Sequence, residues 1–312
     1  MGARTSDLID FYYDELHGEL EGLEAERKRL LRNLSIVALI TAAAFVAYVI
    51  YADGDILYDR VYTVLFVALP VVFVAREWMS RSYRKRFKQE VFGRIVARVD
   101  PSLSYEPEGK VPEALFVASG LFGTRYDTYR GSDLIRGKIG ETPIRFSNLK
   151  VKKRKGDDDE TIFAGTFIVT EFHKHFTHPL AVMPDVAERY LGVIGSWMQN
   201  AGARNLVRLD SPRFEKYFKV YSDDAVEAHY LLTPNLMEKI VELRERAGAD
   251  LYLSFRYDKL FIAIANGGRW FEPSLFRSLL RLDIVKGYIE NLQLLLGIVE
   301  ELNLNRRIWS KE

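Results

Sequence analysis

The hydrophobic pattern of this chain is dominated by two apolar runs on either side of a short polar turn. The first run, Leu34 to Ala52, contains no charged residue, and Tyr48 and Tyr51 lie near its end. A bilayer core about 30 Å thick needs roughly 20 apolar residues in a helix, and tyrosine is enriched at the membrane interface. The pattern therefore predicts a transmembrane helix over residues 33–52.

The second apolar run is shorter. Val61 to Ala75 is uncharged and contains Pro70, and Trp78 must reach one interface. Membrane helices tolerate proline because neighbouring groups satisfy the backbone carbonyl that it leaves free. We predict a second transmembrane helix over residues 61–78 and a short external loop over residues 53–60. The alternative is a buried helical pair in a soluble protein, but neither run has the polar face of a soluble surface helix.

The charges around the two runs predict their orientation. Four basic residues lie between positions 27 and 32, and residues 76–88 are rich in lysine and arginine, whereas the connecting loop holds three aspartates. Cytoplasmic segments that flank membrane helices carry an excess of Lys and Arg. Both termini are therefore predicted to be cytoplasmic.

Both spans are expected to continue as helices beyond the membrane. Apolar residues recur at helical spacing from about Asp7 into the first span, so residues 1–32 are predicted to form an amphipathic helix. The same spacing continues after the second span to about Val99, where Pro101 ends the helix. Residues 79–112 are thus predicted to form a basic stalk helix followed by a linker.

The two extensions carry complementary charge, because the first is acidic in its outer part and the second is basic. Antiparallel pairing about the loop would bring together Glu26 with Arg81, Glu19 with Lys88, and Asp10 with Arg98. We predict a two-helix cytoplasmic stalk in which each exposed ion pair contributes about 0.2–1 kcal/mol and selects the register more than it stabilises the pair. The alternative is that the basic run lies on anionic lipid.

The remaining residues, 113–312, predict a soluble domain of mixed secondary structure. Short apolar segments bounded by turn residues are expected as strands over residues 115–116, 121–122, 133–139, 142–152, 161–169, 205–209, 226–232, 251–257 and 260–265. Helices are expected over residues 184–200, 212–218, 234–246 and 274–304. Because the strands follow one another in hairpins, the predicted fold class is α+β with an antiparallel sheet, attached to the transmembrane hairpin and its stalk.

Composition excludes several classes of function. The 312-residue chain has a net charge of +1, so a general affinity for nucleic acid is not expected. The chain contains no cysteine, which removes thiolate metal sites, iron–sulfur clusters, thiol nucleophiles and disulfides together.

Short motifs in the soluble domain resemble those of a known family. The most specific stretch, from Leu209 to Pro234, reads LDSPRFEKYFKVYSDDAVEAHYLLTP. Shorter matches are DTY at 127–129, GSD at 131–133, GKIG at 137–140, FS at 146–147, FAG at 163–165, VMPD at 182–185, and LN and IW at 304–309. The chain resembles the bacterial family of two-span inner-membrane proteins catalogued as domain of unknown function 3137.

This resemblance implies location and architecture but no reaction. It implies a multi-pass protein of the bacterial inner (plasma) membrane. Members are often encoded beside LemA-type membrane proteins, which implies a membrane assembly. Two positions depart from the family pattern, because Asn148 stands where the family has an acidic residue and His229 where it has an arginine.

Three histidines are the candidate metal ligands. On an extended strand His173 and His175 share one face, and His178 folds back to complete a set of three imidazoles, a number typical of zinc sites. The competing interpretation is a polar strand end, since Lys174 is interleaved and no carboxylate stands at fixed spacing. We predict no cofactor and no metal on balance.

A second candidate cluster combines acidic residues with a histidine. Asp223, Asp224, Glu227 and His229 lie within seven positions, a composition that suits acid–base or metal-assisted hydrolysis. The competing interpretation is a turn followed by a strand whose Val226, Ala228 and Tyr230 face inward. We assign no catalytic residue.

The sequence therefore predicts an inner-membrane protein without enzymatic activity. Its expected partners are the lipid bilayer and either a membrane protein or a second copy of the chain, which would bind the cytoplasmic domain. The alternative function is a membrane-tethered hydrolase or ligand sensor that uses the acidic and histidine residues of that domain.

Overall fold

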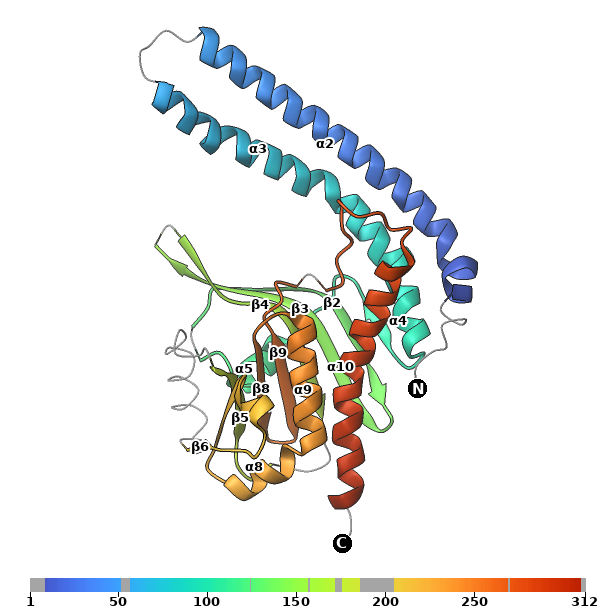
Figure 1. Cartoon of the computed structure of the whole chain (residues 1–312), viewed down its shortest axis with the longest axis vertical. Helices are drawn as coiled ribbons and strands as arrows, with labels where there is room; N and C mark the ends of the chain where they lie inside the picture. Colours follow the sequence, from blue (N-terminus) through green and yellow to red (C-terminus); the bar gives the residue numbers. More distant parts are fainter. Residues whose placement is uncertain are drawn as a thin grey trace. The chain divides into compact units, whose positions relative to one another are not determined.

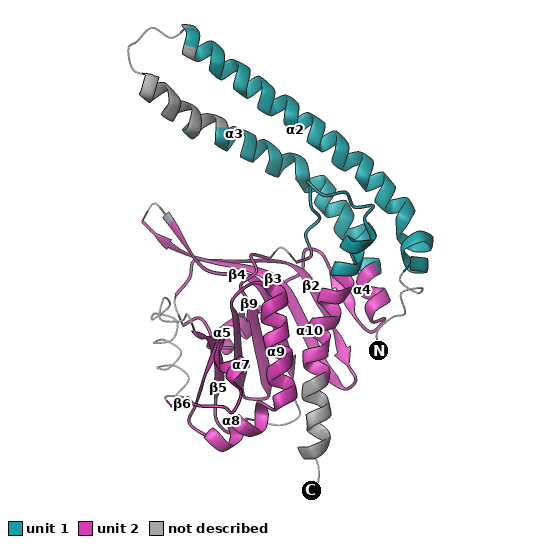
Figure 2. Cartoon of the chain, in the orientation of Figure 1, with its two compact units in different colours: residues 1–94, 272–287 teal, residues 95–271, 288–312 magenta. Residues whose placement is uncertain are grey.

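The computed structural model describes residues 9–51, 57–123, 125–156, 158–171, 176–185, 205–268 and 270–309. The chain forms two compact units, which Figure 2 shows in different colours. Unit 1 comprises residues 1–94 and 272–287, and unit 2 comprises residues 95–271 and 288–312. Residues 272–287, although close to the C-terminus in sequence, thus pack with the N-terminal helices.

Unit 1 is built on two long helical segments (Figure 1). The first is helical from Ile9 and contains a π-helical turn, η1 (Tyr12–Leu16), followed by α2 (His17–Tyr51). The second consists of α3 (Leu57–Arg86), η2 (Phe87–Phe92) and α4 (Gly93–Val99), which crosses into unit 2. The predicted long apolar N-terminal helix is confirmed, and so is the predicted helix end at Val99.

The apolar side chains of the first segment change from buried to exposed along its length. Phe11, Leu16, Leu20 and Leu23 are buried, whereas the apolar side chains between residues 36 and 50 are largely exposed, with Leu39 at 71%. By length and composition, the segment Ile9–Tyr48 could span a bilayer. The predicted second span is described in part, because the side chains of residues 51–65 lie outside the description.

Residues 272–281, which we call the strap, correct the predicted C-terminal helix. A helix was expected from Ser274, but α10 begins at Leu282 and runs to Trp309. The hydroxyl of Ser274 accepts the backbone N–H groups of Phe276 and Arg277. Such local side-chain bonds compete with helix formation. Leu275 and Leu279, expected on the apolar stripe of the helix, are instead buried in non-helical chain.

The charges of the two helical segments pair in a different register from the predicted one. Glu26 pairs with Arg86 (2.8 Å) rather than Arg81, and Glu19 pairs with Arg94 (3.1 Å) rather than Lys88. Side chains on a helix tilt toward its N-terminus. In an antiparallel pair this tilt points the glutamates of the first segment away from the connecting loop and the arginines of the second segment toward it. Each glutamate therefore meets an arginine whose backbone lies further from the loop than a match of backbone positions predicts.

Unit 2 contains an antiparallel sheet of nine strands among the described residues. The strand order is β1-β2-β3-β4-β9-β8-β5-β7-β6, and every neighbouring pair is antiparallel. The strands are β1 (Ser104–Glu106), β2 (Thr128–Ile139), β3 (Thr142–Lys155), β4 (Asp158–Glu171), β5 (Leu180–Pro184), β6 (Leu206–Val207), β7 (Phe218–Ser222), β8 (Leu251–Arg256) and β9 (Lys259–Ile264). The predicted α+β class with an antiparallel sheet is confirmed.

Several predicted elements of unit 2 are corrected. Residues 115–116 and 226–232 were expected as strands, but residues 115–116 lie in helix α5 (Glu113–Ala118) and residues 226–231 lie in helix α8 (Ala225–Leu231). The expected helix over residues 212–218 is a single turn, α7 (Pro212–Glu215), followed by β7. Short apolar runs are compatible with either state until tertiary contacts decide. The expected helix over residues 184–200 lies outside the described residues apart from Pro184, which ends β5, and Asp185.

Helices cover both faces of the sheet. Phe116 of α5 packs on one face, where its ring contacts those of Phe122, Phe163 and Phe167. On the other face lie α9 (Pro234–Ala247), which confirms the predicted helix over residues 234–246, and the later part of α10 (Figure 1). These two helices are joined by Arg246, which bonds Glu290 at 2.6 Å.

Candidate functional site

The structure brings together one residue from each of the two predicted clusters. His178 lies in the loop before β5, Asp224 is the N-cap of α8, and Glu227 is in the first turn of α8. The Nδ1 atom of His178 is 3.6 Å from Asp224 Oδ2 and 3.6 Å from Glu227 Oε2. One ligand atom from each residue lies within 4.8 Å of the others, so these three residues could hold a metal ion.

Backbone hydrogen bonds fix the two carboxylates of this cluster. Asp224 Oδ1 accepts the N–H groups of Val226 and Glu227, each at 2.9 Å, as an N-cap should. Glu227 accepts the N–H groups of Thr177 at 3.2 Å and His178 at 3.1 Å, which ties α8 to the loop before β5. The carboxylates therefore hold the local backbone together whether or not an ion binds.

The imidazole of His178 is less well satisfied than the carboxylates. Its Nδ1 atom is buried but has no hydrogen-bond partner among the described residues. A separation of 3.6 Å is too long for a hydrogen bond but close to that between two ligands of one tetrahedral metal ion with bonds of about 2.0–2.1 Å. The arrangement suits either a bound cation or, when His178 is protonated, a pair of weak ion contacts.

Among the described residues, the other predicted site residues, Asp223 and His229, lie outside this cluster. His173 and His175 lie outside the described residues. His229 is exposed, and its Nδ1 lies 2.7 Å from the carbonyl of Ala225 in the preceding turn of α8. Asp223 is exposed. Because residues 225–231 are helical, Val226 does not face inward as expected for a strand but is 78% exposed.

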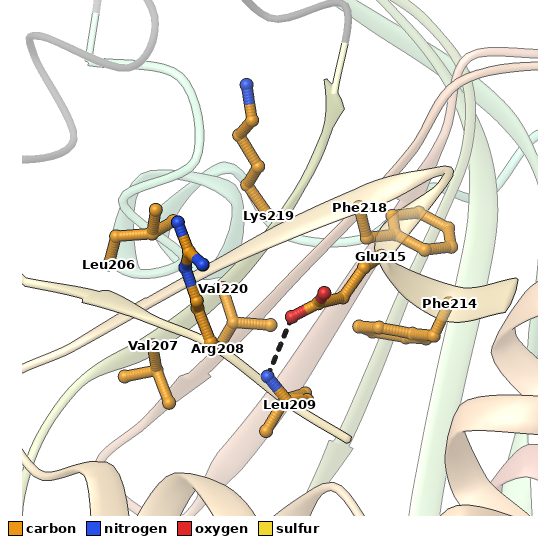
Figure 3. Close-up of a pocket in the computed structure, with 9 residues that line it drawn as sticks. All are labelled: Leu206, Val207, Arg208, Leu209, Phe214, Glu215, Phe218, Lys219 and Val220. Atoms are coloured by element: carbon orange, nitrogen blue, oxygen red, sulfur yellow. Dashed lines mark hydrogen bonds between the residues drawn. The ribbon is translucent and has the colours of Figure 1, made fainter. Parts of the chain in front are cut away.

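A pocket of about 210 Å³ lies beside the edge strand β6 (Figure 3). The rings of Phe214 and Phe218 lie together on one side of it, with centroids 5.0 Å apart. Glu215 Oε1 accepts the N–H of Leu209 at 2.8 Å, so this carboxylate closes the pocket as part of the turn that follows β6. Both rings are almost fully buried, so they are core residues that form one wall of this pocket.

Asn148, one of the two departures from the family pattern, belongs to a buried polar network. Its side-chain amide donates to Asp133 (3.1 Å), and its carbonyl oxygen accepts from the hydroxyl of Thr166 (3.0 Å). Asp133 also accepts from the hydroxyl of Tyr105 at 2.7 Å and has a positive φ of 63° at an irregularity in β2. The network links β1, β2, β3 and β4, which indicates a structural role for Asn148.

Comparison with protein families gives a match over the C-terminal part of the chain. Residues 161–304 match the model of a family described as "Protein of unknown function (DUF3137)". The match supports this family. It includes the motif region from Leu209 to Pro234, whereas the motifs before residue 161 lie outside it.

Comparisons with curated proteins and solved structures add no functional information. No curated protein matches the chain. Among solved structures, the chain is similar to the mycobacterial trehalose monomycolate transport factor A, with 12% sequence identity and a TM-score of 0.28. The alignment covers 65% of this chain and 94% of that one. At this TM-score the likeness supports no statement about function.

Proposed function

We propose that the protein is a two-span inner-membrane protein of the DUF3137 family whose cytoplasmic α+β domain binds another membrane protein or a second copy of the chain. The observation that carries this proposal is the change in burial along α2. Apolar side chains are buried up to Leu23, and those from Ile36 to Ile50 are largely exposed. No enzymatic activity is part of the proposal.

Lipid is the environment that suits the exposed part of α2. Burying apolar surface stabilises by roughly 25 cal/mol per Å², so a long exposed apolar helix is unfavourable in water. Phe66, Leu69, Phe73 and Val74 of α3 are exposed in the same way. Insertion of both helices in a bilayer removes this surface from water, while the excess of basic residues beyond their ends supports cytoplasmic termini.

Cysteine accessibility tests the topology directly, because the chain contains no cysteine. Single substitutions Gly54→Cys, in the predicted external loop, and Gly18→Cys, in the N-terminal helix, would be expressed in bacterial cells. A Cβ at Gly18 meets no atom within 4 Å, so this change leaves the fold intact. We expect a membrane-impermeant maleimide to label position 54 in intact cells and position 18 only after permeabilisation. The reverse pattern would refute the orientation, and protection of both sites in intact cells would refute the double span.

The exposed apolar residues of α8 support a protein-binding role for unit 2. Val226 and Tyr230 lie four residues apart on this helix and are 78% and 50% exposed. Together with Ala225 and His229 they line a shallow open depression. Residues four apart share one helix face, and exposed aromatic and aliphatic residues are typical of interface anchors.

A photo-crosslinking experiment tests this surface. We would place p-benzoylphenylalanine at Val226 or, as the control, at Glu242, which is exposed on α9. We expect irradiation of cells to give a discrete adduct with a membrane protein or with a second copy of the chain from position 226 but not from position 242. Equal adducts from both positions, or none from position 226, would contradict the proposal.

A second candidate function, sensing of a divalent cation, is favoured by the unpartnered Nδ1 of His178 beside two carboxylates. Calorimetric titration of the detergent-solubilised full chain with zinc chloride tests it. Binding should disappear in His178→Ala and persist in His229→Ala, because His229 lies outside the cluster. The absence of heat at micromolar zinc, or equal loss in both variants, would eliminate this candidate.

A further inference from the structure

The part of unit 1 that adjoins the exposed apolar stretches of α2 and α3 carries a large excess of positive charge. Residues 24–32 and 76–86 contain nine lysines and arginines but only three acidic residues. All three acidic residues are engaged by arginines within this set, Glu24 by Arg27 (2.6 Å), Glu26 by Arg86 (2.8 Å) and Glu77 by Arg84 (2.8 Å). The negative charge available within this region is therefore already neutralised.

Several of the basic residues that remain are exposed. Lys28, Arg29 and Arg32 of α2 and Arg81 of α3 have exposed side chains. Among the described residues, no carboxylate lies within ion-pair distance of the three arginines, and Lys28 is only within 4.0 Å of Glu24, which Arg27 already engages. These four cations lie directly beyond the apolar residues that the proposed function places in the bilayer.

The strap adds two further residues at the same level. Its Leu275 lines one small cavity together with Leu31, Leu34 and Met79. The carbonyl of Leu275 accepts a hydrogen bond of 2.8 Å from Arg27 Nη1, which fixes the position of the strap along α2. The next two residues, Phe276 and Arg277, are both exposed, Phe276 at 70%. A large aromatic residue is thus presented to solvent beside the basic residues.

We propose that these residues form a binding surface for anionic phospholipid headgroups. The surface, which we call the basic collar, comprises Lys28, Arg29, Arg32, Arg81 and Arg277, with Trp78 and Phe276 as its aromatic residues. This inference rests on the proposed insertion of α2 and α3 in the membrane. It adds that the strap, from the C-terminal part of the chain, touches the bilayer surface.

Three physical arguments favour a lipid headgroup as the occupant. Arginine suits the phosphate of a lipid headgroup, because the guanidinium donates two parallel hydrogen bonds to phosphate oxygens. Tryptophan is enriched at the headgroup level, and Trp78 is 71% exposed at the end of the proposed span. Each basic residue near an anionic surface contributes about fivefold to association, and the effect decays within a Debye length. Because the collar lies at the predicted boundary between the membrane and water, its residues are at the distance from the anionic headgroups where the electrostatic attraction is strongest.

Lipid selectivity of the full-length protein tests the collar. The protein would be reconstituted in phosphatidylcholine vesicles that contain trace spin-labelled phosphatidylglycerol or spin-labelled phosphatidylcholine, and the immobilised fraction of each lipid would be measured. We expect at least a severalfold preference for phosphatidylglycerol that weakens as salt is raised. The preference should disappear when Lys28, Arg29, Arg32, Arg81 and Arg277 are all changed to glutamine.

The control variant removes positive charge away from the collar. In it, Arg125, Arg130, Lys150 and Lys155 are changed to glutamine. These residues are exposed in unit 2 and should leave the preference unchanged. Equal immobilisation of the two lipids by the native chain would overturn the inference, and so would an equal loss in the control variant. If the protein fails to float with any vesicle, including pure phosphatidylcholine, the proposed function itself falls.

Contact of the strap with the bilayer is tested separately at Phe276. Phe276→Cys, labelled with an environment-sensitive nitrobenzoxadiazole dye, should show blue-shifted emission in vesicles and quenching by lipids spin-labelled near the headgroup. Tyr13→Cys is the control, because Tyr13 is an exposed residue of unit 1 on the first helical segment. At 1.5 Å per residue it lies about 30 Å from residue 33, where the membrane span is predicted to begin. Equal quenching at both positions, or none at position 276, would refute contact by the strap.

Discussion

The polar clamp between α2 and the strap gives the most direct test of how unit 1 is held together. Glu24 and Arg27 are both buried, at 3% and 7% exposed, and form two charge-assisted hydrogen bonds of 2.6 and 2.9 Å. Each also holds the backbone of the strap. Arg27 Nη1 donates to the carbonyl of Leu275 at 2.8 Å, and Glu24 Oε2 accepts the N–H of Leu279 at 3.1 Å. The perturbation is Arg27→Met, which preserves much of the side-chain volume.

The expected cost follows from the burial of Glu24. Removing one partner of a buried pair leaves an uncompensated charge and costs about 3–5 kcal/mol, whereas replacing both partners by apolar residues is often close to neutral. The second variant is therefore Glu24→Leu combined with Arg27→Met. It loses the two bonds to the strap backbone, each worth about 0.5–1.5 kcal/mol, but leaves no buried charge. We expect the double variant to be more stable than the single one.

Hydrogen exchange of the strap amides measures this difference. Opening of the strap exposes the N–H of Leu279, so a loss of 3 kcal/mol should accelerate its exchange by a factor of about 100 or more. The acceleration in the double variant should be clearly smaller. Arg281→Met is the matched control, because Arg281 pairs with Asp283 in the same region but both side chains are exposed. This variant should leave the exchange of Leu279 unchanged.

The pH dependence of the clamp has a defined sign. The hydrogen bonds from Arg27 hold the pKa of Glu24 below its usual value of 4.5. The folded state therefore binds the proton of Glu24 less tightly than the unfolded state. The stabilisation is complete above about pH 4.5 and is lost as pH falls through the lowered pKa.

Less than tenfold faster exchange of the Leu279 amide in Arg27→Met, or a double variant as unstable as the single one, would refute a charge-based clamp.

Three further predictions concern the fold. Gly165→Ala in β4 should destabilise unit 2 by at least about 1–3 kcal/mol in a denaturant titration, because a Cβ there would lie 1.8 Å from a backbone oxygen of the neighbouring strand. Asp224→Ala should cost about 0.5–2 kcal/mol of stability, since the N-cap bonds of α8 are lost. A double-mutant cycle of Glu19→Gln and Arg94→Gln on the free energy of unfolding should give a coupling of about 0.2–1 kcal/mol, because this ion pair is exposed.

Each of these predictions has a control. Gly287→Ala in α10, where a Cβ meets no atom within 4 Å, should raise stability slightly, and a loss equal to that of Gly165→Ala would contradict the steric argument. Asp224→Asn keeps a capping oxygen and should be nearly neutral. If it is as unstable as Asp224→Ala, the N-cap is not the cause. The same cycle with Glu19→Gln and Lys88→Gln should give no coupling, because Lys88 pairs with Glu272 at 2.8 Å; a coupling there instead of at Arg94 would restore the ion pair expected from the sequence.

Long and regular features of this protein could be predicted from the sequence. The helix from Ile9 to Tyr51, the helix end at Val99 and α9 were all predicted, because apolar periodicity and proline act locally and over many residues. The antiparallel sheet was predicted from alternation and hairpin turns. Short elements were not predictable. Residues 225–231 alternate like a strand, but the Asp224 side chain caps them as a helix.

The candidate site was predicted only in part. His178, Asp224 and Glu227 were singled out, but in two separate groups, because Asp224 lies 46 positions after His178 and no local pattern joins them. Their contact depends on the pairing of β5 with β7, which brings the loop before β5 to the N-terminus of α8. Pairing of strands distant in sequence is a property of the whole sheet.

The sequence by itself determined that this chain carries two apolar runs with basic flanks, since hydropathy and charge are properties of the residues themselves. Only the tertiary structure decided where residues 272–281 lie. Leu275 and Leu279 have helical spacing with the residues that follow, yet both are buried in unit 1, where Arg27 and Glu24 bind the strap backbone. Backbone N–H and C=O groups are the same at every residue, so no sequence pattern shows which of them a buried ion pair will hold.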